Sequence, residues 1–327
     1  MSTILVTGGA GFIGSCFVAQ AVAKGSHVVV LDALTYAGSR DNLTWISPSW
    51  TLVEGSITDR ALVDGLLRQH DIKTVINFAA ESHVDNSIAG PAAFIETNIT
   101  GTFTMLEACR QYWVGRKGEC RFVQISTDEV YGSLGATGQF TETSPLRPNS
   151  PYSASKAAGD HLAQAWFATY GFPVIVTHCG NNYGPRQHAE KLIPRMIQCA
   201  LSGAVLPVYG DGKNIRDWIH VEDHCRGIWL ALEKGQPGES YNFGGDAELD
   251  NLTLVRMLCA LLDKKRPLPS GSYAKQIAFV TDRLGHDYRY AIDAGKAKRA
   301  LGFMPQYRFD EGLEATMDWY LSRKGMI

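Results

Sequence analysis

The stretch TILVTGGAGFIGS (residues 3–15), with the residues that follow it as far as Asp32, decides the fold. Its first five residues form a β-branched run that predicts a strand. A helix-like pattern follows the glycine turn and stops at Gly25. A second apolar strand is predicted at His27–Leu31, directly before Asp32. The order strand, glycine turn, helix, strand and acid is typical of a dinucleotide-binding unit.

Three glycines and one acid in this unit indicate which dinucleotide it binds. Gly8, Gly11 and Gly14 would let the backbone approach a pyrophosphate, and the helix start offers unpaired N–H groups. Asp32 would accept hydrogen bonds from the adenosine ribose and repel a 2'-phosphate, which favours NAD over NADP. The spacing Gly-x-x-Gly-x-x-Gly differs from the commoner Gly-x-Gly-x-x-Gly, and a glycine trio alone could be a plain helix-packing turn. With both strands and Asp32 in place, the segment predicts NAD binding.

Strands and helices alternate through the next part of the chain. Further strands are predicted at 51–54, 74–78, 121–126 and 174–178, and helices at 59–69, 91–113 and 151–170. Such alternation predicts an α/β fold with a Rossmann-type doubly wound parallel sheet, whose ligands sit beyond the carboxyl ends of the strands. Residues 1–180 are expected to form the NAD-binding domain, to which later segments return.

The remaining residues, 181–327, have a different character. Short helices are predicted to alternate with turns marked by proline and glycine, as at Pro207 and 210–212. This indicates a smaller carboxyl-terminal region, mainly for substrate binding and interleaved with the first domain. The cleft between the two is the expected substrate site.

Composition excludes few functions, but it bears on the binding partners and the cellular compartment. The 327 residues are 45% hydrophobic and 20% charged with a net charge of -2, so no broad basic field is expected for nucleic acid or an acidic membrane. No apolar run approaches the ~20 residues that span a bilayer. Seven scattered cysteines without a C-x-x-C pair favour reduced thiols in the cytoplasm over a disulfide framework or a zinc site. We expect no metal.

The segment 125–156 carries the groups expected to do chemistry. Tyr152 and Lys156 are four residues apart, so they project from the same face of a helix. A free tyrosine has a pKa near ~10, and lowering it by ~3 units requires about 4 kcal/mol of preferential phenolate stabilisation. Lys156 and the positive ring of NAD+ can contribute to this, and the phenolate would act as a general base for a hydroxyl. The alternative, a pair that merely shares a solvated face, is disfavoured next to a nucleotide fold.

Asp128 and Glu129 follow directly after a predicted strand in the same segment. Oxidation of a carbinol makes the neighbouring C–H acidic. A carboxylate can then remove that proton, and a carboxylic acid can protonate a hydroxyl leaving from the next carbon. One acid can be held protonated by the charge of the other. Neighbours on a regular strand point to opposite faces, so both reach one ligand only if the chain leaves the strand here. The alternative is one catalytic and one exposed acid.

These residues resemble the extended short-chain dehydrogenase/reductase superfamily and, within it, the dTDP-glucose 4,6-dehydratases. The motifs that carry the resemblance are TGGAGFIGS (7–15), DALTYAG (32–38), AESHVD (80–85), STDEVYG (126–132), PNSPYSASK (148–156), NNYGP (181–185), EKLIP (190–194), YGDG (209–212), RDW (216–218), VEDH (221–224) and DRLGHDYRY (282–290). The Asp-Glu pair discriminates, because the related sugar-nucleotide 4-epimerases carry small residues there.

The resemblance implies an NAD-dependent lyase that acts on dTDP-glucose. Tyr152, assisted by Lys156 and Thr127, would oxidise C4 with hydride passing to NAD+. Glu129 would remove the C5 proton, and Asp128 would protonate the departing C6 hydroxyl. Return of the hydride to C6 would give dTDP-4-keto-6-deoxyglucose and regenerate NAD+, which should stay bound through turnover.

Ligand contacts and an assembly are implied in the same way. The implied cofactor contacts are Gly8, Gly11, Phe12, Ile13, Gly14, Asp32, Leu34, Thr35, Ser56, Ile57, Phe78, Ala79, Ala80, Ser82, Thr97, Tyr152, Lys156 and Asn182. The implied substrate contacts are Ser82, Thr127, Asp128, Glu129, Tyr152, Asn181, Lys191, Leu192, Pro207, Tyr209, Arg216, Asn251, Arg283, His286 and Tyr290. The helices at 91–113 and 152–170 would form the four-helix interface of a homodimer.

Two departures from the family pattern leave alternatives open. Ser56 stands where an acid that contacts the adenine amino group is usual, and Asn86 stands where arginine is usual. The base-reading residues do not exclude another nucleotide, so a dehydratase of another nucleoside-diphosphate sugar is an alternative. A 4-epimerase is a second alternative if the acids are idle. A catalytically silent NAD-binding regulator is a third, against which retention of Tyr152 and Lys156 argues.

Overall fold

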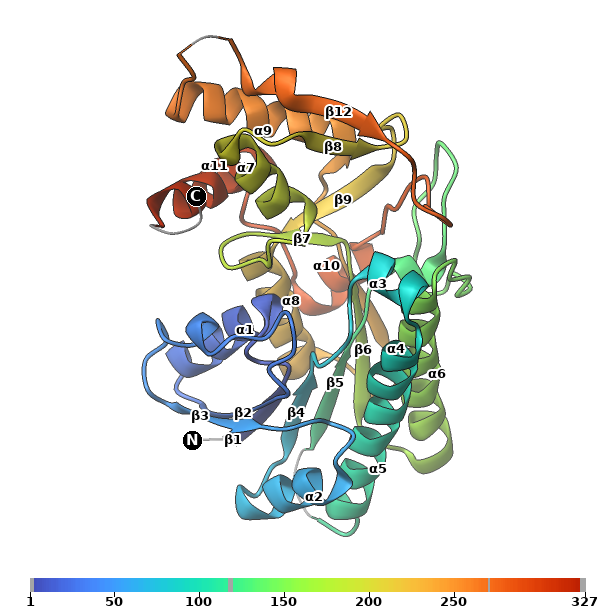
Figure 1. Ribbon diagram of the computed structural model, residues 1–327. Coiled ribbons are helices and arrows are strands. Elements are labelled where there is room, and N and C mark those ends of the chain that lie inside the picture. The colour runs from blue at the N-terminus through green and yellow to red at the C-terminus, as the bar shows by residue number, and fades with distance from the viewer. Residues whose placement is uncertain (1–2, 117–119, 270, 324–327) are drawn as a thin grey trace.

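The computed structural model describes residues 3–116, 120–269 and 271–323. Figure 1 shows a twisted sheet with helices on both faces in the lower half of the molecule. A smaller group of helices and short strands lies above the carboxyl edge of this sheet. Most of the predicted substrate-binding residues lie where these two parts meet.

The large sheet has seven strands, all parallel. Their spatial order is β3 (Trp50–Glu54), β2 (His27–Asp32), β1 (Thr3–Thr7), β4 (Thr74–Asn77), β5 (Arg121–Ile125), β6 (Val174–Cys179) and β10 (Ser240–Phe243). The order reverses between β1 and β4, which creates a crevice for ligands at their carboxyl ends. The predicted Rossmann-type doubly wound sheet is confirmed. Although β10 comes late in the sequence, it pairs with β6 and completes the sheet.

Helices cover both faces because parallel strands must be buried on both sides. On one face lie α1 (Phe12–Ala23) and α8 (Val221–Lys234), and on the other lie α2 (Arg60–Gln69), α5 (Thr102–Trp113) and α6 (Pro151–Tyr170). Side chains of β1 alternate between the two layers. Leu5 packs with the α2 and α5 cluster, whereas Ile4 and Val6 pack with the α1 and α8 cluster.

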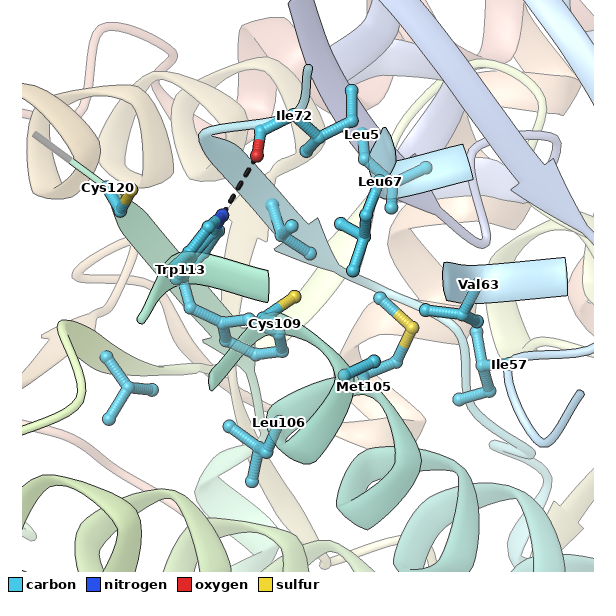
Figure 2. Close-up of a cluster of buried hydrophobic side chains, with 14 of the residues drawn as sticks. Leu5, Ile57, Val63, Leu67, Ile72, Met105, Leu106, Cys109, Trp113 and Cys120 are labelled. Carbon is cyan, nitrogen blue, oxygen red and sulfur yellow. Dashed lines mark hydrogen bonds between the residues drawn. The ribbon is translucent and has the colours of Figure 1, made fainter. Parts of the chain in front are cut away.

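The cluster under α2 and α5 consists mainly of aliphatic and aromatic side chains (Figure 2). Leu5, Leu67, Met105 and Cys109 are buried in it. The Trp113 indole N–H donates to the Ile72 carbonyl at 2.9 Å, so the large ring is buried without an unpaired donor. This core packs against β1, the strand that leads into the glycine turn.

The prediction of one regular helix over 91–113 is wrong in its middle. After α3 (Val84–Ala89), the chain forms α4 (Ala92–Phe94), a π-helix η2 (Ile95–Gly101) and then α5. The cause is Asn98, whose amide accepts from the Glu81 N–H at 2.9 Å and donates to its carbonyl at 3.0 Å and to Ser155 Oγ at 2.8 Å. These tertiary bonds hold a register that local propensity does not favour. Such π segments frequently mark functional sites.

The carboxyl-terminal part consists of two small sheets and their helices. The strands are β7 (Asn181–Tyr183), β9 (Ile215–His220) and β11 (Glu248–Asp250) in one sheet, and β8 (Leu206–Tyr209) and β12 (Ile277–Val280) in the other. The helices are α7 (Leu192–Ser202), α9 (Asn251–Lys265), α10 (Gly295–Leu301) and α11 (Phe309–Ser322).

Most of these helices are longer than predicted. The helix α9 has 15 residues, because Leu254, Leu258 and Leu262 form a stripe at i, i+4 and i+8 that is buried in the local core. No helix in the described ranges is long and apolar enough to cross a membrane.

Candidate active site

The glycine turn after β1 is closed tightly against the loop after β4. Gly8 has φ of +66°, and a Cβ on it would lie 2.7 Å from the Ala79 backbone nitrogen. A Cβ on Gly14 would lie 2.2 Å from the Gly8 carbonyl oxygen. Only glycine fits either position, which leaves the N-terminus of α1 open for a phosphate to approach.

Asp32 is built into this turn. It is 8% exposed, and its two carboxylate oxygens accept from the Ala10 and Leu34 backbone N–H groups, each at 2.9 Å. Burial raises the pKa of Asp32, and these two hydrogen bonds oppose the shift. Each carboxylate oxygen carries a second lone pair, so ribose hydroxyls can still be bound. The turn and the acid therefore fit a dinucleotide.

The other residues predicted to contact the cofactor follow the ends of neighbouring strands. The positions after β2, β3 and β4, and one in the π-helix, are Leu34, Thr35, Ser56, Ile57, Phe78, Ala79, Ala80, Ser82 and Thr97. Ser56 Oγ already bonds Thr58, with 2.8 Å between the hydroxyls and 3.1 Å to the backbone nitrogen. The Asn182 amide is occupied as well, by Cys179 Sγ at 3.2 Å, the Gly180 carbonyl at 3.1 Å and His224 Nδ1 at 3.0 Å.

The helix α6 carries Tyr152 and Lys156 at its start. Ser150 caps it with a capping box, Pro151 occupies its first turn, and Gly171 ends it with φ of +62°, as predicted. Lys156 Nζ donates to the carbonyl of Ile125, the last residue of β5, at 2.6 Å. Tyr152 and Lys156 are both buried, at 8% and 5% exposed. The pair thus faces the sheet, not solvent.

The charges of this pair are set mainly by burial. Burial, followed by the charge of Glu129, raises the pKa of Tyr152 well above its ordinary value. Burial lowers the pKa of Lys156, and the charge of Asp160 opposes that shift. The predicted lowering of the Tyr152 pKa depends on bound NAD+ as well as on Lys156, so it stays a prediction. In the chain alone, burial and the charge of Glu129 shift the pKa of Tyr152 in the opposite direction.

Asp128 and Glu129 lie on η3 (Asp128–Tyr131), a 3-10 turn that begins where β5 has ended. Thr127 caps this turn and donates from its hydroxyl to Asp128 Oδ1 at 3.3 Å. Because the chain has left the strand, the two acids need not point to opposite faces. Asp128 is 1% exposed, and its Oδ2 is buried with no hydrogen-bond partner among the described residues.

The two acids have different surroundings. Burial and then the charge of Glu129 raise the pKa of Asp128 well above its ordinary value. Burial also raises the pKa of Glu129, but Arg216, Lys191 and Arg283 oppose that shift. Asp128 is thus the acid that keeps its proton more readily. Environments that separate two carboxyl groups in this way indicate an acid and a base.

A cavity lies between the Rossmann part and the carboxyl-terminal part. Eleven of the predicted substrate contacts line it: Ser82, Glu129, Asn181, Lys191, Leu192, Pro207, Tyr209, Arg216, Asn251, Arg283 and His286. Four others do not line it, namely Thr127, Asp128, Tyr152 and Tyr290. Tyr290 instead packs its ring under the Arg216 guanidinium, 4.4 Å from the ring centroid, and so supports that arginine.

The cavity is well suited to an anion. Lys191, Arg195, Arg216 and Arg283 all line it. Arginine and lysine side chains provide the donors and charge that bind a diphosphate. No group of three or more His, Cys, Asp or Glu side chains is placed to hold a metal ion within residues 3–116, 120–269 and 271–323.

Comparison with known proteins identifies the family. The chain is 56% identical over 334 residues to dTDP-glucose 4,6-dehydratase of Xanthomonas campestris pv. campestris (strain B100), a match that covers 100% of this chain and 95% of the relative. A family model described as GDP-mannose 4,6 dehydratase matches residues 5–316. The chain belongs to the dTDP-glucose 4,6-dehydratase family. The resemblance carried by the sequence motifs is confirmed.

Solved structures of both a dehydratase and an epimerase have the same fold as this chain. The DesIV dTDP-glucose 4,6-dehydratase of Streptomyces venezuelae, crystallised with NAD and dTDP, is 48% identical with a TM-score of 0.91, covering 99% of this chain and 98% of that one. UDP-glucose 4-epimerase of Thermotoga maritima, crystallised with UDP-glucose, is 29% identical with a TM-score of 0.87 and 98% coverage of both chains. The backbone alone therefore does not separate the 4,6-dehydratase family from an epimerase.

Several residues at this 4,6-dehydratase site were not predicted from the sequence. Asp85 lines the cavity and makes an ion pair with Arg283, with 2.6 Å between carboxylate oxygen and Nε. Glu190 and Arg195 also line it. The motifs 80–85 and 190–194 contain or adjoin these positions, but only the folded chain brings Asp85 to Arg283.

Proposed function

We propose that this chain is an NAD-dependent dTDP-glucose 4,6-dehydratase, a hydro-lyase whose product is dTDP-4-keto-6-deoxyglucose. The observation that carries the proposal is the pairing of a buried Asp128 and a cavity-lining Glu129 with Tyr152 and Lys156. The names of the family relatives and the NAD in the DesIV structure support it. An epimerase has no use for two acids with such different environments.

The cofactor is assigned to the crevice at the carboxyl ends of β1 to β4. Gly8, Gly11 and Gly14 would adjoin the pyrophosphate of NAD, and Asp32 would bind the adenosine ribose. When bound, the cofactor would supply the hydride chemistry, with NAD+ as acceptor for C4 and its reduced form as donor to C6. The positive ring of NAD+ also supplies the charge that a Tyr152 phenolate needs.

Tyr152, Lys156 and Thr127 serve the first step. Tyr152 takes the proton of the C4 hydroxyl as the C4–H bond breaks. The Lys156 ammonium, held by the Ile125 carbonyl, adds a positive charge one helical turn away. The Thr127 hydroxyl, which donates to Asp128 in the chain alone, would donate instead to Tyr152 and so favour the phenolate. Loss of the proton and hydride leaves a ketone at C4.

The two acids serve the second step. Glu129, surrounded by three cationic side chains, takes the proton from C5. Asp128, which burial and Glu129 keep protonated, gives its proton to the oxygen that leaves C6 as water. The C5–H and C6–O bonds break, and a C5–C6 double bond forms. Hydride return to C6 and protonation at C5 complete the sugar, so water is the only group lost.

The substrate is assigned to the cavity that the cationic residues line. Arg216 and Arg283 would bind the diphosphate, and Lys191 and Asn181 would lie along the sugar nucleotide. In this proposal residues 1–180 hold NAD, and residues 181–327 mainly hold the substrate. The free state of all seven cysteines supports a cytoplasmic enzyme.

We also propose a homodimer formed by the helices in 91–113 and 152–170. Four large apolar side chains on these helices are exposed in the single chain: Ile95, Phe103, Phe167 and Tyr170. Exposed apolar groups gathered on neighbouring helices are typical of an interface. A second copy of the same helix pair would complete a four-helix contact.

Incubation of the purified chain with dTDP-glucose tests the proposed function. We expect a 4-keto product that absorbs in alkali, with no net change in NAD. A simple inversion at C4 would contradict the proposal. A parallel series with UDP-glucose, GDP-glucose and GDP-mannose decides the base, because the matching family model is described by GDP-mannose. We expect the highest kcat/KM with dTDP-glucose.

A further inference from the structure

A buried polar network lies directly beneath the turn that carries the two acids. Asp160 Oδ2 accepts from Ser126 Oγ at 2.8 Å and lies 3.1 Å from His178 Nε2. The other ring nitrogen, His178 Nδ1, lies 3.1 Å from the Tyr131 hydroxyl. That hydroxyl donates to Asn242 Oδ1 at 2.9 Å. All five side chains are at most 4% exposed.

The network holds both ends of the catalytic turn. Ser126 precedes Thr127, and Tyr131 is the last residue of η3, so residues 127–130 are bracketed by two hydroxyls. Both hydroxyls bind the same Asp160–His178 pair. Asp160 lies on α6 one turn after Lys156, and His178 lies on β6. The pair therefore joins the acid turn to the helix of Tyr152 and to the sheet.

Counting protons limits the states open to His178. The Asn242 amide nitrogen donates to the Phe140 carbonyl at 3.3 Å, so its oxygen must face Tyr131. Tyr131 has one proton, which it gives to that oxygen, so it can only accept from His178 Nδ1. At the other nitrogen, one hydrogen lies between His178 Nε2 and Asp160 Oδ2. With that hydrogen on the imidazole, both ring nitrogens carry hydrogen and the two residues form an ion pair.

We propose that Asp160 and His178 form a buried ion pair that acts as a positioning device for the acid turn of Asp128 and Glu129. Neither residue touches the substrate. This inference rests on the proposed function, because the turn it positions is the one assigned to the elimination. The surrounding charges are consistent with a pair: Lys156 on α6 faces Asp160, and Glu142 and Asp128 lie on the Tyr131 side.

A buried ion pair is seldom kept for stability, because desolvation of two charges offsets most of their attraction. An apolar pair of similar size would fill the same space. What charge adds here is directional hydrogen bonding to two hydroxyls on either side of the catalytic residues. That is the property a positioning role needs.

The first test removes one hydroxyl from the network. Tyr131→Phe should lower kcat about 10- to 100-fold, with KM for dTDP-glucose within about twofold, because a small displacement of the acids slows elimination. Reduced cofactor should accumulate during turnover, since Tyr152 and Lys156 still act. The matched control is Tyr273→Phe, which removes a buried hydroxyl bonded to the Arg266 carbonyl at 2.8 Å, away from the cavity. It should leave both constants unchanged.

Unchanged kcat in Tyr131→Phe, or equal losses in both variants, would overturn the positioning role. An unmodified protein that does not dehydrate dTDP-glucose would overturn the proposed function instead.

The second test examines the unmodified protein and does not depend on activity. Nitrogen NMR with labelled histidine, assigned with His178→Gln, should show hydrogen on both His178 nitrogens at neutral pH. A neutral ring with one bare nitrogen would refute the ion pair.

Discussion

Replacing Glu129 by glutamine separates the two halves of the proposed reaction. Glutamine keeps the shape of the side chain but cannot take the C5 proton. A general base contributes about 10²- to 10⁴-fold, so turnover should fall by that factor, or about 2.7 to 5.4 kcal/mol in barrier height. Tyr152 and Lys156 are untouched, so bound NAD+ should still be reduced by dTDP-glucose. The enzyme should stall with reduced cofactor and a C4 ketone.

The same substitution should shift the pH dependence of the reduction step. The charge of Glu129 is the second cause, after burial, that raises the pKa of Tyr152. Removing the negative charge lowers the pKa of Tyr152. The midpoint for NAD+ reduction should therefore move to lower pH.

Stopped-flow absorbance of the reduced nicotinamide measures the reduction step, and alkaline absorbance of the 4-keto product measures turnover. Glu311→Gln is the control, because its side chain is 71% exposed in the carboxyl-terminal helix α11. Full turnover by Glu129→Gln would refute the assignment of the base. A midpoint that moves to higher pH would refute the electrostatic argument.

Three further experiments test the substrate contacts, the cofactor contacts and the proposed interface. Arg283→Ala should raise KM for dTDP-glucose about 10-fold or more, since a hydrogen bond to a charged group is worth about 1.5 to 3 kcal/mol. Asp85→Asn should not raise KM, because Asp85 would compete with the diphosphate for Arg283. Steady-state kinetics measures both. Asp32→Asn should weaken NAD retention, because the asparagine NH2 group would face one of the two backbone N–H groups that Asp32 now binds. The amount of NAD released when the purified protein is denatured measures the retention. If the proposed homodimer forms, light scattering should find Phe103→Glu as a monomer, whereas Met304→Glu, at an exposed position outside both helices, should stay a dimer.

The sequence was sufficient for the parts of the fold that depend on local patterns. Runs of β-branched residues predicted β1 and β2, and Ser150 and Gly171 marked the ends of α6, because caps and αL positions have strong residue preferences. The π-helix was missed because its cause is Asn98, which bonds residues distant in the sequence. The pairing of Asp85 with Arg283 was missed for the same reason.

The direction of the Tyr152 pKa shift could not be read from the sequence either. The spacing of Tyr152 and Lys156 indicates a cation near a phenol, but it says nothing of burial. In the folded chain burial has the largest effect on both groups, raising the pKa of Tyr152 and lowering that of Lys156. Both shifts disfavour the charged form that catalysis uses. A local pattern can therefore suggest which chemical groups lie together but not their resting protonation states.

In the proposed mechanism, this resting state suits an enzyme that must not react before its cofactor is in place. A buried phenol beside two carboxyl groups resists ionisation, so Tyr152 would become a base only when the positive ring of NAD+ lies beside it. The elimination would also wait for the oxidation. Glu129 would act on C5 only after oxidation has made that hydrogen acidic, and Asp128 would keep its proton for the leaving hydroxyl. On this proposal, a backbone shared with an epimerase supports a dehydration because η3 places two acids, in unequal environments, next to Tyr152 and Lys156.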